Sequence, residues 1–292
     1  MSAVAIGLVI LSAVFHALRS LFTKASGDKQ IFLWWYSIFA LLFFSPLFLA
    51  YLFRVGIPDP LAYAWCFGSG FIHFLYWIFL TQSYKEGDLS HVYPIMRSSP
   101  ALVLVVAVLF LGEEVSVQGV TGILMVAFGV YIINMKQISA DELLTPIKSL
   151  AHDRSTRFAF LTLISVAFYS IVDKMAVSYI HPILFAFLHL FCGMCYYTPY
   201  IVLTKNRDLI KKEWNAGITR IILAGIMGIA GYTLILIAFT IERVSYIVAL
   251  RQISIVFAVL MGSHILKEKH RVMRLTGAVI IFTGGFLISL AK

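Results

Sequence analysis

The sequence predicts an all-α membrane protein of ten transmembrane helices, arranged as two inverted five-helix repeats. Three observations lead to this fold class. Of the 292 residues, 61% are hydrophobic and only 13% are charged, whereas soluble domains have about 45–50% apolar and about 25% charged residues. Apolar runs of at least ~18 residues recur along the chain, as expected for membrane-spanning helices. The two halves of the sequence also repeat one another.

Ten apolar segments are expected to span the bilayer, at residues 3–22, 31–53, 61–83, 89–111, 116–135, 158–179, 182–204, 217–239, 244–266 and 272–290. The first is too long, and too weakly basic before its apolar run, to be a cleaved signal peptide. The only long connection is polar and mixed in charge. It divides the chain into a first repeat at 1–135, a linker at 136–157 and a second repeat at 158–292.

Equivalent positions in the two halves hold matching residue types. A shift of 155 residues aligns Ser90 with Ser245, Ser99 with Ser254, Glu113 with Glu268, Gly122 with Gly277 and Gly129 with Gly284. Five spans is an odd number, so the second half enters the membrane inverted. Inverted repeats are the build of many secondary transporters, with the substrate site near mid-membrane at the repeat interface. The glycines are expected to let helices pack closely rather than to carry chemistry.

Lysines and arginines are unequally divided between the two sides of the predicted membrane. Most of the 23 lie in the loops that follow spans 1, 3, 5, 7 and 9, while the opposite side holds only Arg54, Lys174, Arg243 and Lys292. The positive-inside rule predicts both termini outside and the linker in the cytoplasm of a cell (inner) membrane protein. The net charge of +9 is therefore attributed to topology and not to nucleic-acid binding.

The ionisable side chains inside the spans carry the functional prediction. They are all basic or neutral, and the fourteen acids, Asp173 included, are expected in loops or near span ends; the interior set is His16, Arg19, His73, Arg97, His189 and Arg251. Charge in hydrocarbon is costly without a counter-charge, and an anionic substrate is the simplest supply. Arg97 lies about 12 Å from one side and Arg251 about 10 Å from the other. Two such guanidinium groups suit phosphate or carboxylate.

These residues also have structural explanations that stay open. Arg97 and Arg251 can snorkel or cap the carbonyls of broken helices, Arg19 can reach the nearby interface, and His73 and His189 can be packing histidines. Pro94 and Pro100 flank Arg97, whereas the repeat positions hold Ala249 and Ile255. The span at 89–111 is therefore expected to be kinked and the span at 244–266 straighter.

Other pocket residues are expected where they share a helix face or a repeat position with the basic groups. His16 is three residues before Arg19, so the two share a face. The aromatic candidates are Tyr93, Trp77, Tyr169 and Tyr232, which can wall a pocket and hydrogen-bond a ligand. Gln252 aligns with Arg97 in the repeat. The substrate-binding set is thus Arg97, Arg251, His16, Tyr93, Trp77, His73, Arg19, Tyr232, Tyr169 and Gln252.

Lys24 and Lys174 lie at the ends of spans 1 and 6, and the segments "LFLGEE" (109–114) and "HILKEK" (264–269) are each followed by a glycine-bearing helix. In these features the chain resembles the drug/metabolite transporter superfamily, in its EamA-type branch. The resemblance implies a ten-helix transporter; members include amino-acid and metabolite exporters, nucleotide-sugar carriers and sugar-phosphate exchangers. The sugar-phosphate branch binds phosphate through basic residues on spans 4 and 9, which here hold Arg97 and Arg251. Its paired Lys-Arg is Arg251–Gln252 in this chain, so a carboxylate or amino acid stays open.

Together these features predict a secondary active or exchange transporter for a small anionic organic metabolite, phosphorylated or carboxylated, working by alternating access. No catalytic residue, metal or cofactor is expected, and the partners are the lipid bilayer and a small anion, with the protein a monomer or weak homodimer. Without an interior carboxylate, exchange, facilitated export or a histidine relay fits better than coupling through Asp or Glu. One alternative is an exporter of amino acids or amphipathic drug-like compounds, which the 15% aromatic content supports. Another is a non-transporting membrane assembly or lipid-modifying protein.

Overall fold

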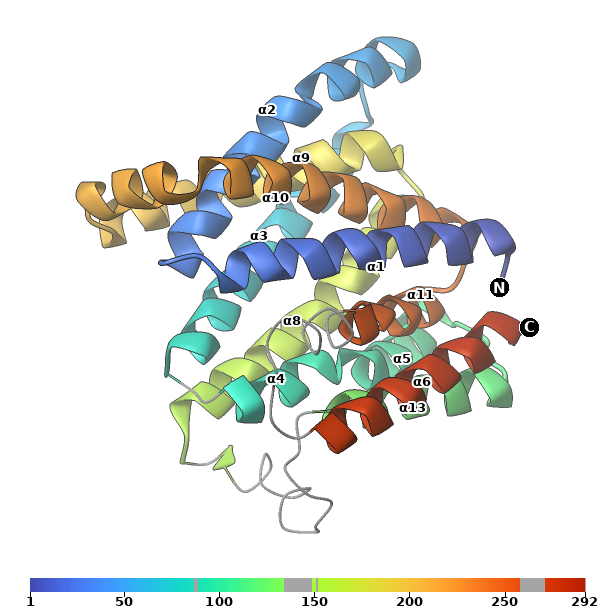
Figure 1. Ribbon diagram of the computed structural model, residues 1–292. Coiled ribbons are helices and arrows are strands. Elements are labelled where there is room, and N and C mark those ends of the chain that lie inside the picture. Colours follow the sequence, from blue (N-terminus) through green and yellow to red (C-terminus); the bar gives the residue numbers. More distant parts are fainter. Residues whose placement is uncertain (87–88, 134–148, 151, 258–270, 292) are drawn as a thin grey trace.

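The computed structural model describes residues 1–86, 89–133, 149–150, 152–257 and 271–291. Regular structure in these ranges is helical only. Eight helices are long and apolar enough to cross a membrane, and two shorter apolar helices accompany them. The predicted fold class, ten spans in two inverted five-helix repeats, is confirmed (Figure 1).

The first repeat contains α1 (Ala3–Lys24), α2 (Lys29–Val55), α3 (Pro60–Glu86), a span divided into α4 (Leu89–Arg97) and α5 (Ser99–Leu111), and α6 (Val117–Ile132). The second contains α8 (Arg154–Ala176), α9 (Pro182–Thr204), α10 (Arg207–Ile241), α11 (Val244–Arg251) and α13 (Arg271–Leu290). Most of the predicted linker, and the "HILKEK" segment with Glu268, lie outside the described residues.

Two helices begin earlier than the hydropathy pattern predicts. α8 starts at Arg154 because the Asp153 side chain accepts hydrogen bonds from the amides of Ser155 and Thr156 and so caps the helix. α10 starts at Arg207, and its first turns are polar up to Gly217, where the backbone leaves helical geometry. Hydropathy locates the apolar part of a helix, whereas these polar first turns are set by their caps.

Each of the two spans that carry the central arginines is interrupted at that arginine. α4 ends at Arg97 and α5 begins at Ser99, so the predicted kink is present. α11 likewise ends at Arg251, with a turn at Gln252, so the prediction that this span is the straighter one is wrong. The Ala101 amide donates a hydrogen bond to the Ser98 carbonyl and not to that of Arg97. The Arg97 carbonyl instead accepts a hydrogen bond from Gln252 Nε2 at 3.3 Å. The two interruptions therefore meet across the repeat interface, without proline in the second.

Glycines bring α6 and α13 into direct backbone contact. A Cβ on Gly122 would stand 2.8 Å from the Gly284 carbonyl, and one on Gly129 would stand 2.9 Å from the Gly277 carbonyl. The contact is reciprocal, since a Cβ on Gly277 or Gly284 would meet the carbonyl of its partner at 2.7 Å. We call these four residues the glycine seam. The predicted packing role of these glycines is confirmed.

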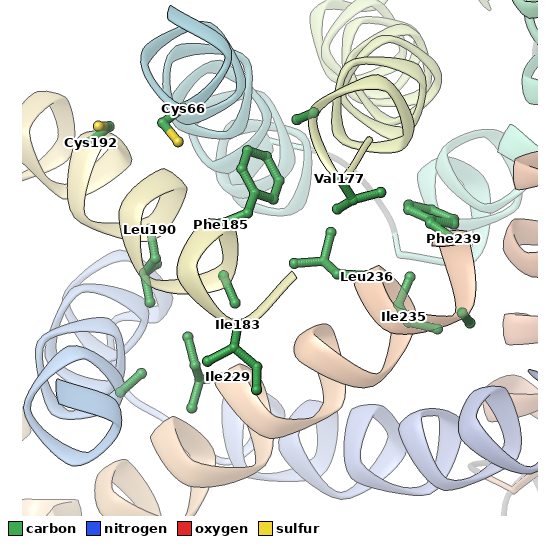
Figure 2. Close-up of a cluster of buried hydrophobic side chains, with 14 of the residues drawn as sticks. Cys66, Val177, Ile183, Phe185, Leu190, Cys192, Ile229, Ile235, Leu236 and Phe239 are labelled. Carbon is green, nitrogen blue, oxygen red and sulfur yellow. The ribbon is translucent and has the colours of Figure 1, made fainter. Parts of the chain in front are cut away.

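A buried apolar core holds α3, α8, α9 and α10 together. Its largest members include Phe185, Leu236 and Phe239, each at most 2% exposed (Figure 2). Gly70 of α3 lies so close to α9 that a Cβ there would be 2.7 Å from the Gly193 amide. These four helices carry the buried carboxylate described below and the side chains around it, and the core fixes them relative to one another.

The first and last described residues lie together at one face of the bundle, where the Met1 amine donates to the Ser289 and Ala291 carbonyls. We call this the terminal face and the opposite one the linker face. At the terminal face, Glu113 accepts from the amides of Val244 and Ser245 and caps α11. Lys174 donates to the carbonyls of Phe239 and Glu242 at the end of α10.

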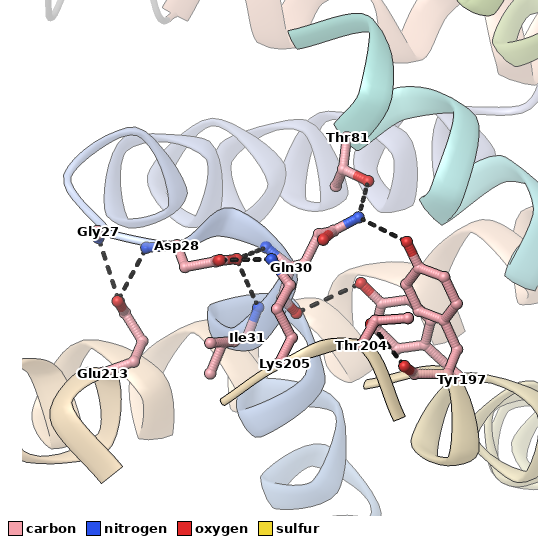
Figure 3. A network of polar contacts seen from close by, with 10 residues as sticks. Gly27, Asp28, Gln30, Ile31, Thr81, Tyr197, Thr204, Lys205 and Glu213 are labelled. Carbon is pink, nitrogen blue, oxygen red and sulfur yellow. Dashed lines mark hydrogen bonds and ion pairs between the residues drawn. The ribbon is translucent and has the colours of Figure 1, made fainter. Parts of the chain in front are cut away.

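A second polar network ties helix ends together at the linker face (Figure 3). Glu213 accepts from the amides of Gly27 and Asp28, and Lys205 Nζ lies 2.5 Å from Asp28 Oδ2. Burial alone would raise the pKa of Asp28, but the bonds from Lys205 and from the amides of Ile31 and Gln30 outweigh it and hold that pKa below its ordinary value. The network therefore keeps an ionised carboxylate between α2 and α9.

Candidate substrate site

Three arginines from separate helices converge on one imidazole in the interior of the bundle. We call Arg19 of α1, Arg97 of α4 and Arg251 of α11 the arginine cluster. Arg19 NH2 lies 3.0 Å from His16 Nδ1, and Arg97 NH2 lies 3.1 Å from His16 Nε2. Arg251 is the third cation in the electrostatic surroundings of the same ring. The structure thus joins four of the predicted site residues at the repeat interface.

Aromatic rings, and not carboxylates, cover the guanidinium groups. Arg19 lies 5.6 Å from the ring centroid of Tyr36 and donates to its hydroxyl at 3.1 Å, while Arg97 lies 5.2 Å from the ring of Tyr93. The Arg251 guanidinium lies 5.7 Å from the ring of Tyr232. Among the described residues, no carboxylate forms an ion pair with any member of the cluster. Cation–π contacts offset only part of the cost of withdrawing three charges from water.

Arg251 is the least satisfied member of the cluster. Its Nε is buried, and in the described part of the chain it has no hydrogen-bond partner. A buried unpaired donor of this kind costs free energy that a bound acceptor would recover. The guanidinium is held in place instead by the end of α11 and by the Tyr232 ring.

A buried carboxylate lies next to this cluster, and the prediction of an interior without anions is wrong. Asp173 is near the end of α8, as expected, but its side chain points inward and is 0% exposed. Ser69 donates to Oδ1 at 2.5 Å and Tyr232 donates to Oδ2, while His73 Nε2 lies 3.9 Å from Oδ2. Its place near the end of α8 was a poor guide to its exposure, because side chains of the neighbouring helices α3 and α10 enclose the carboxylate.

The predicted histidines and aromatic residues divide between the two groups. His73 stacks on Tyr169, with ring centroids 4.2 Å apart, and His189 lies 5.1 Å from both His73 and Tyr232. These residues surround Asp173. Trp77 is directed away from the arginine cluster: it packs on Tyr197, with ring centroids 5.3 Å apart, and against Gly193. Gln252 contacts the cluster through the Arg97 carbonyl.

Sequence reasoning missed Asp173, Ser69, Tyr36 and Tyr76. Tyr36 contacts Arg19, and the Tyr76 ring lies 5.5 Å from that of Tyr169. One signal was available: Asp173 follows Tyr169 by four residues, so a predicted pocket residue and a lone acid share one helix face. The other three are common residue types in apolar helices, and nothing in their spacing marks them.

Comparison with known proteins assigns the chain to a family. The model of the EamA-like transporter family matches residues 3–135 and again residues 156–290. The chain belongs to the EamA-like transporter family. It is therefore a multi-pass membrane protein of the drug/metabolite transporter type, and the family matches each half of the chain separately, in agreement with the internal repeat.

The family fold is also found among solved structures. One of them, titled only "Crystal structure of protein", superposes with a TM-score of 0.74 at 16% identity, over 99% of this chain and 98% of that one. At this identity the likeness shows the fold alone. No curated protein matches this EamA-like transporter significantly.

Proposed function

We propose that this EamA-like transporter moves a small organic anion, phosphorylated or carboxylated, across the membrane by alternating access. The observation that carries the proposal is the arginine cluster around His16, without a carboxylate partner in the described part of the chain. Three half-buried cations gathered around one imidazole form a site in need of negative charge.

The hydrogen bonds of His16 sharpen this argument. A neutral imidazole accepts through one ring nitrogen and donates through the other. Guanidinium nitrogens approach both ring nitrogens of His16, at 3.0 and 3.1 Å, so one of the two contacts sets a donor against a donor. An oxyanion between Arg19, Arg97 and Arg251 would accept from each of them and from the ring N–H. A bound anion therefore removes the mismatch that the ring alone leaves.

The position of the cluster suits alternating access. Arg97 and Arg251 each end a helix at an interruption, and the Gln252–Arg97 bond joins the two interruptions. A ligand that bridges the arginines would bridge the two repeats as well. Its binding would then depend on how the repeats are arranged, which is what a transport cycle requires.

Counterflow in proteoliposomes tests the proposal. Liposomes would be loaded in turn with glycerol 3-phosphate, citrate, glutamate and an amphipathic cation, and uptake of the same labelled compound would be followed. We expect accumulation of an anion, a loss of at least about tenfold in Arg97→Gln and Arg251→Gln, and no loss in Arg54→Gln, whose side chain is exposed. Wild-type rates in both cluster variants, or accumulation of the cation alone, would overturn it.

A second candidate, export of amino acids or amphipathic compounds, has one observation in its favour. Aromatic rings extend from the arginine cluster past the carboxylate, in the order Tyr232, His73, Tyr169 and Tyr76, each in contact with the next. Such a wall would accept an apolar or aromatic body. The same counterflow panel decides, since this candidate expects the amphipathic cation to compete with the anions.

A further inference from the structure

The buried carboxylate takes no part in holding an anion, and its surroundings are those of a proton site. Asp173 is enclosed by hydroxyls from two other helices, Ser69 of α3 and Tyr232 of α10. A hydroxyl can donate to a carboxylate and can equally accept from a carboxylic acid. Asp173 can therefore gain or lose a proton without leaving a buried polar atom unsatisfied.

His73 lies beside Asp173 and can pass a proton to it. His73 Nδ1 lies 3.0 Å from the Ser69 carbonyl and His189 Nδ1 lies 2.9 Å from the Phe185 carbonyl, so each ring carries its proton on Nδ1. This leaves Nε2 as the acceptor. In His73 that atom faces the Tyr232 hydroxyl at 3.3 Å and the carboxylate at 3.9 Å. When Nε2 of His73 takes up a proton, it can donate to the Tyr232 hydroxyl, whose own hydrogen is donated to Asp173, so that His73, Tyr232 and Asp173 form a path for one proton.

Tyr232 joins this path to the arginine cluster. Its hydroxyl donates to Asp173, and the face of its ring lies 5.7 Å from the Arg251 guanidinium. The carboxylate and the guanidinium are thus separated by about the length of one tyrosine side chain. At that distance in a buried site, one charge alters the proton affinity of the other by about tenfold.

We propose that the anion and a proton bind together, the proton at Asp173, so that this protein is a proton–anion symporter. The inference rests on the proposed function, because it takes the anion to bind at Arg251. The positive charge of Arg251 favours ionised Asp173. An anion on Arg251 cancels that charge and so favours the protonated carboxyl. By reciprocity, a protonated Asp173 binds the anion more tightly.

In the part of the chain that the structure describes, the other charged or titratable groups near Asp173 include no second carboxylate. Arg97 of α4 and Arg251 of α11 are cations, and α5 contributes no titratable side chain. The remaining groups are His73 and Cys66 of α3, His189 of α9, Tyr232 of α10, and Tyr169 and Lys174 of α8 itself. The bound proton is therefore assigned to Asp173, with His73 and Tyr232 as its route.

Infrared titration of the purified protein tests the proton site without any ligand. The carbonyl-stretch band of a protonated carboxylic acid would be followed across a pH series through neutrality. We expect a titrating band in the wild type, its loss in Asp173→Asn, and its persistence in Asp208→Asn, whose acid is exposed. In Arg251→Gln the band should persist to higher pH by about one unit, because the charge favouring ionisation is gone.

Calorimetry with sulfate tests the coupling. Sulfate is the probe because it stays dianionic throughout this pH range, and titrations in buffers of different ionisation enthalpy count the protons taken up. We expect uptake of up to about one proton per sulfate in the wild type, and none in Asp173→Asn, whose sulfate affinity should no longer vary with pH. Proton release on binding, or binding without proton exchange in the wild type, would overturn symport.

The two experiments separate failure of the inference from failure of the proposed function. If sulfate does not bind but the band titrates and shifts in Arg251→Gln, the anion assignment fails while Asp173 stays a proton site coupled to Arg251. If sulfate binds and no carboxylic acid band titrates, the arginine cluster holds anions and the proton inference is wrong.

Discussion

Single residues decide whether the two interrupted spans stay in register. Gln252 is the example: its amide is 6% exposed, and it is the donor that satisfies the Arg97 carbonyl left free where α4 ends. Removing the donor leaves a buried carbonyl without a hydrogen bond. The free-energy cost of that unsatisfied acceptor exceeds the net stabilisation that the hydrogen bond provided, because no water can replace the donor. The position of Arg97 therefore depends on a neutral side chain of the other repeat.

Replacement of Gln252 with Leu should destabilise the protein by about 1–3 kcal/mol, because it keeps the volume and removes the donor. The measurement is denaturant or thermal unfolding in detergent. Gln118→Leu is the matched control, since Gln118 Nε2 also donates to a carbonyl at 3.3 Å, but from an exposed position. That variant should stay within about 0.5 kcal/mol of the wild type. Equal losses in the two variants would contradict the role given to Gln252.

Whole helices are positioned by backbone contact where small residues allow it. α6 and α13 hold equivalent places in the two repeats, and the glycine seam sets their separation. In lipid, helices gain little from hydrophobic association, so close packing provides much of the stabilisation. The seam lies apart from the arginine cluster, which makes it a support for the bundle and not part of the ligand site.

Gly129→Ala should therefore lower the stability of the protein by about 1–3 kcal/mol, since its Cβ would meet the Gly277 carbonyl at 2.9 Å and neither backbone can yield cheaply. Thermal unfolding in detergent measures the loss. Gly68→Ala provides the comparison, because a Cβ on Gly68 has no atom within 4 Å among the described residues. It should be neutral or stabilise by up to about 1 kcal/mol. A destabilised Gly68→Ala with an unaffected Gly129→Ala would refute the packing argument.

For the molecule as a whole, the two faces are closed by different networks. The terminal face has Glu113 on the start of α11 and Lys174 on the end of α10, while the linker face has Glu213 and the Asp28–Lys205 pair. The Glu113 contact and both contacts of the linker face join the first repeat to the second, whereas the Lys174 contact lies within the second repeat. Opening either face requires these bonds to exchange with water.

The orientation of these faces follows from the charge bias of the loops and is open to direct measurement. We expect an epitope tag on either terminus to be reached by antibody in intact cells, and a tag inserted within residues 136–148 to be reached only after permeabilisation. The physical reason is the excess of lysine and arginine on the linker face. The reverse pattern of access would place the linker outside.

Much of this architecture could be predicted from sequence, because hydropathy, odd span number and repeated glycines are each local patterns with one structural meaning. The meeting of Arg97, Arg251 and His16 was predictable for the same reason, through depth along a helix. The environment of Asp173 was not, because it depends on which helices enclose the end of α8. The turn at Gln252 was also hidden, since a side chain of one repeat, rather than a proline, compensates for it.

The glycine seam has a genetic consequence. At each of its four positions, the three atoms nearest to an added Cβ include a carbonyl oxygen of the facing helix, less than 3.0 Å away. Every residue type carries that carbonyl, so no substitution at the facing glycine can make room for a methyl group. Second-site suppressors of a mutation in the glycine seam should therefore not arise at the partner glycine. Each of the four positions requires glycine regardless of which residue occupies the position that faces it.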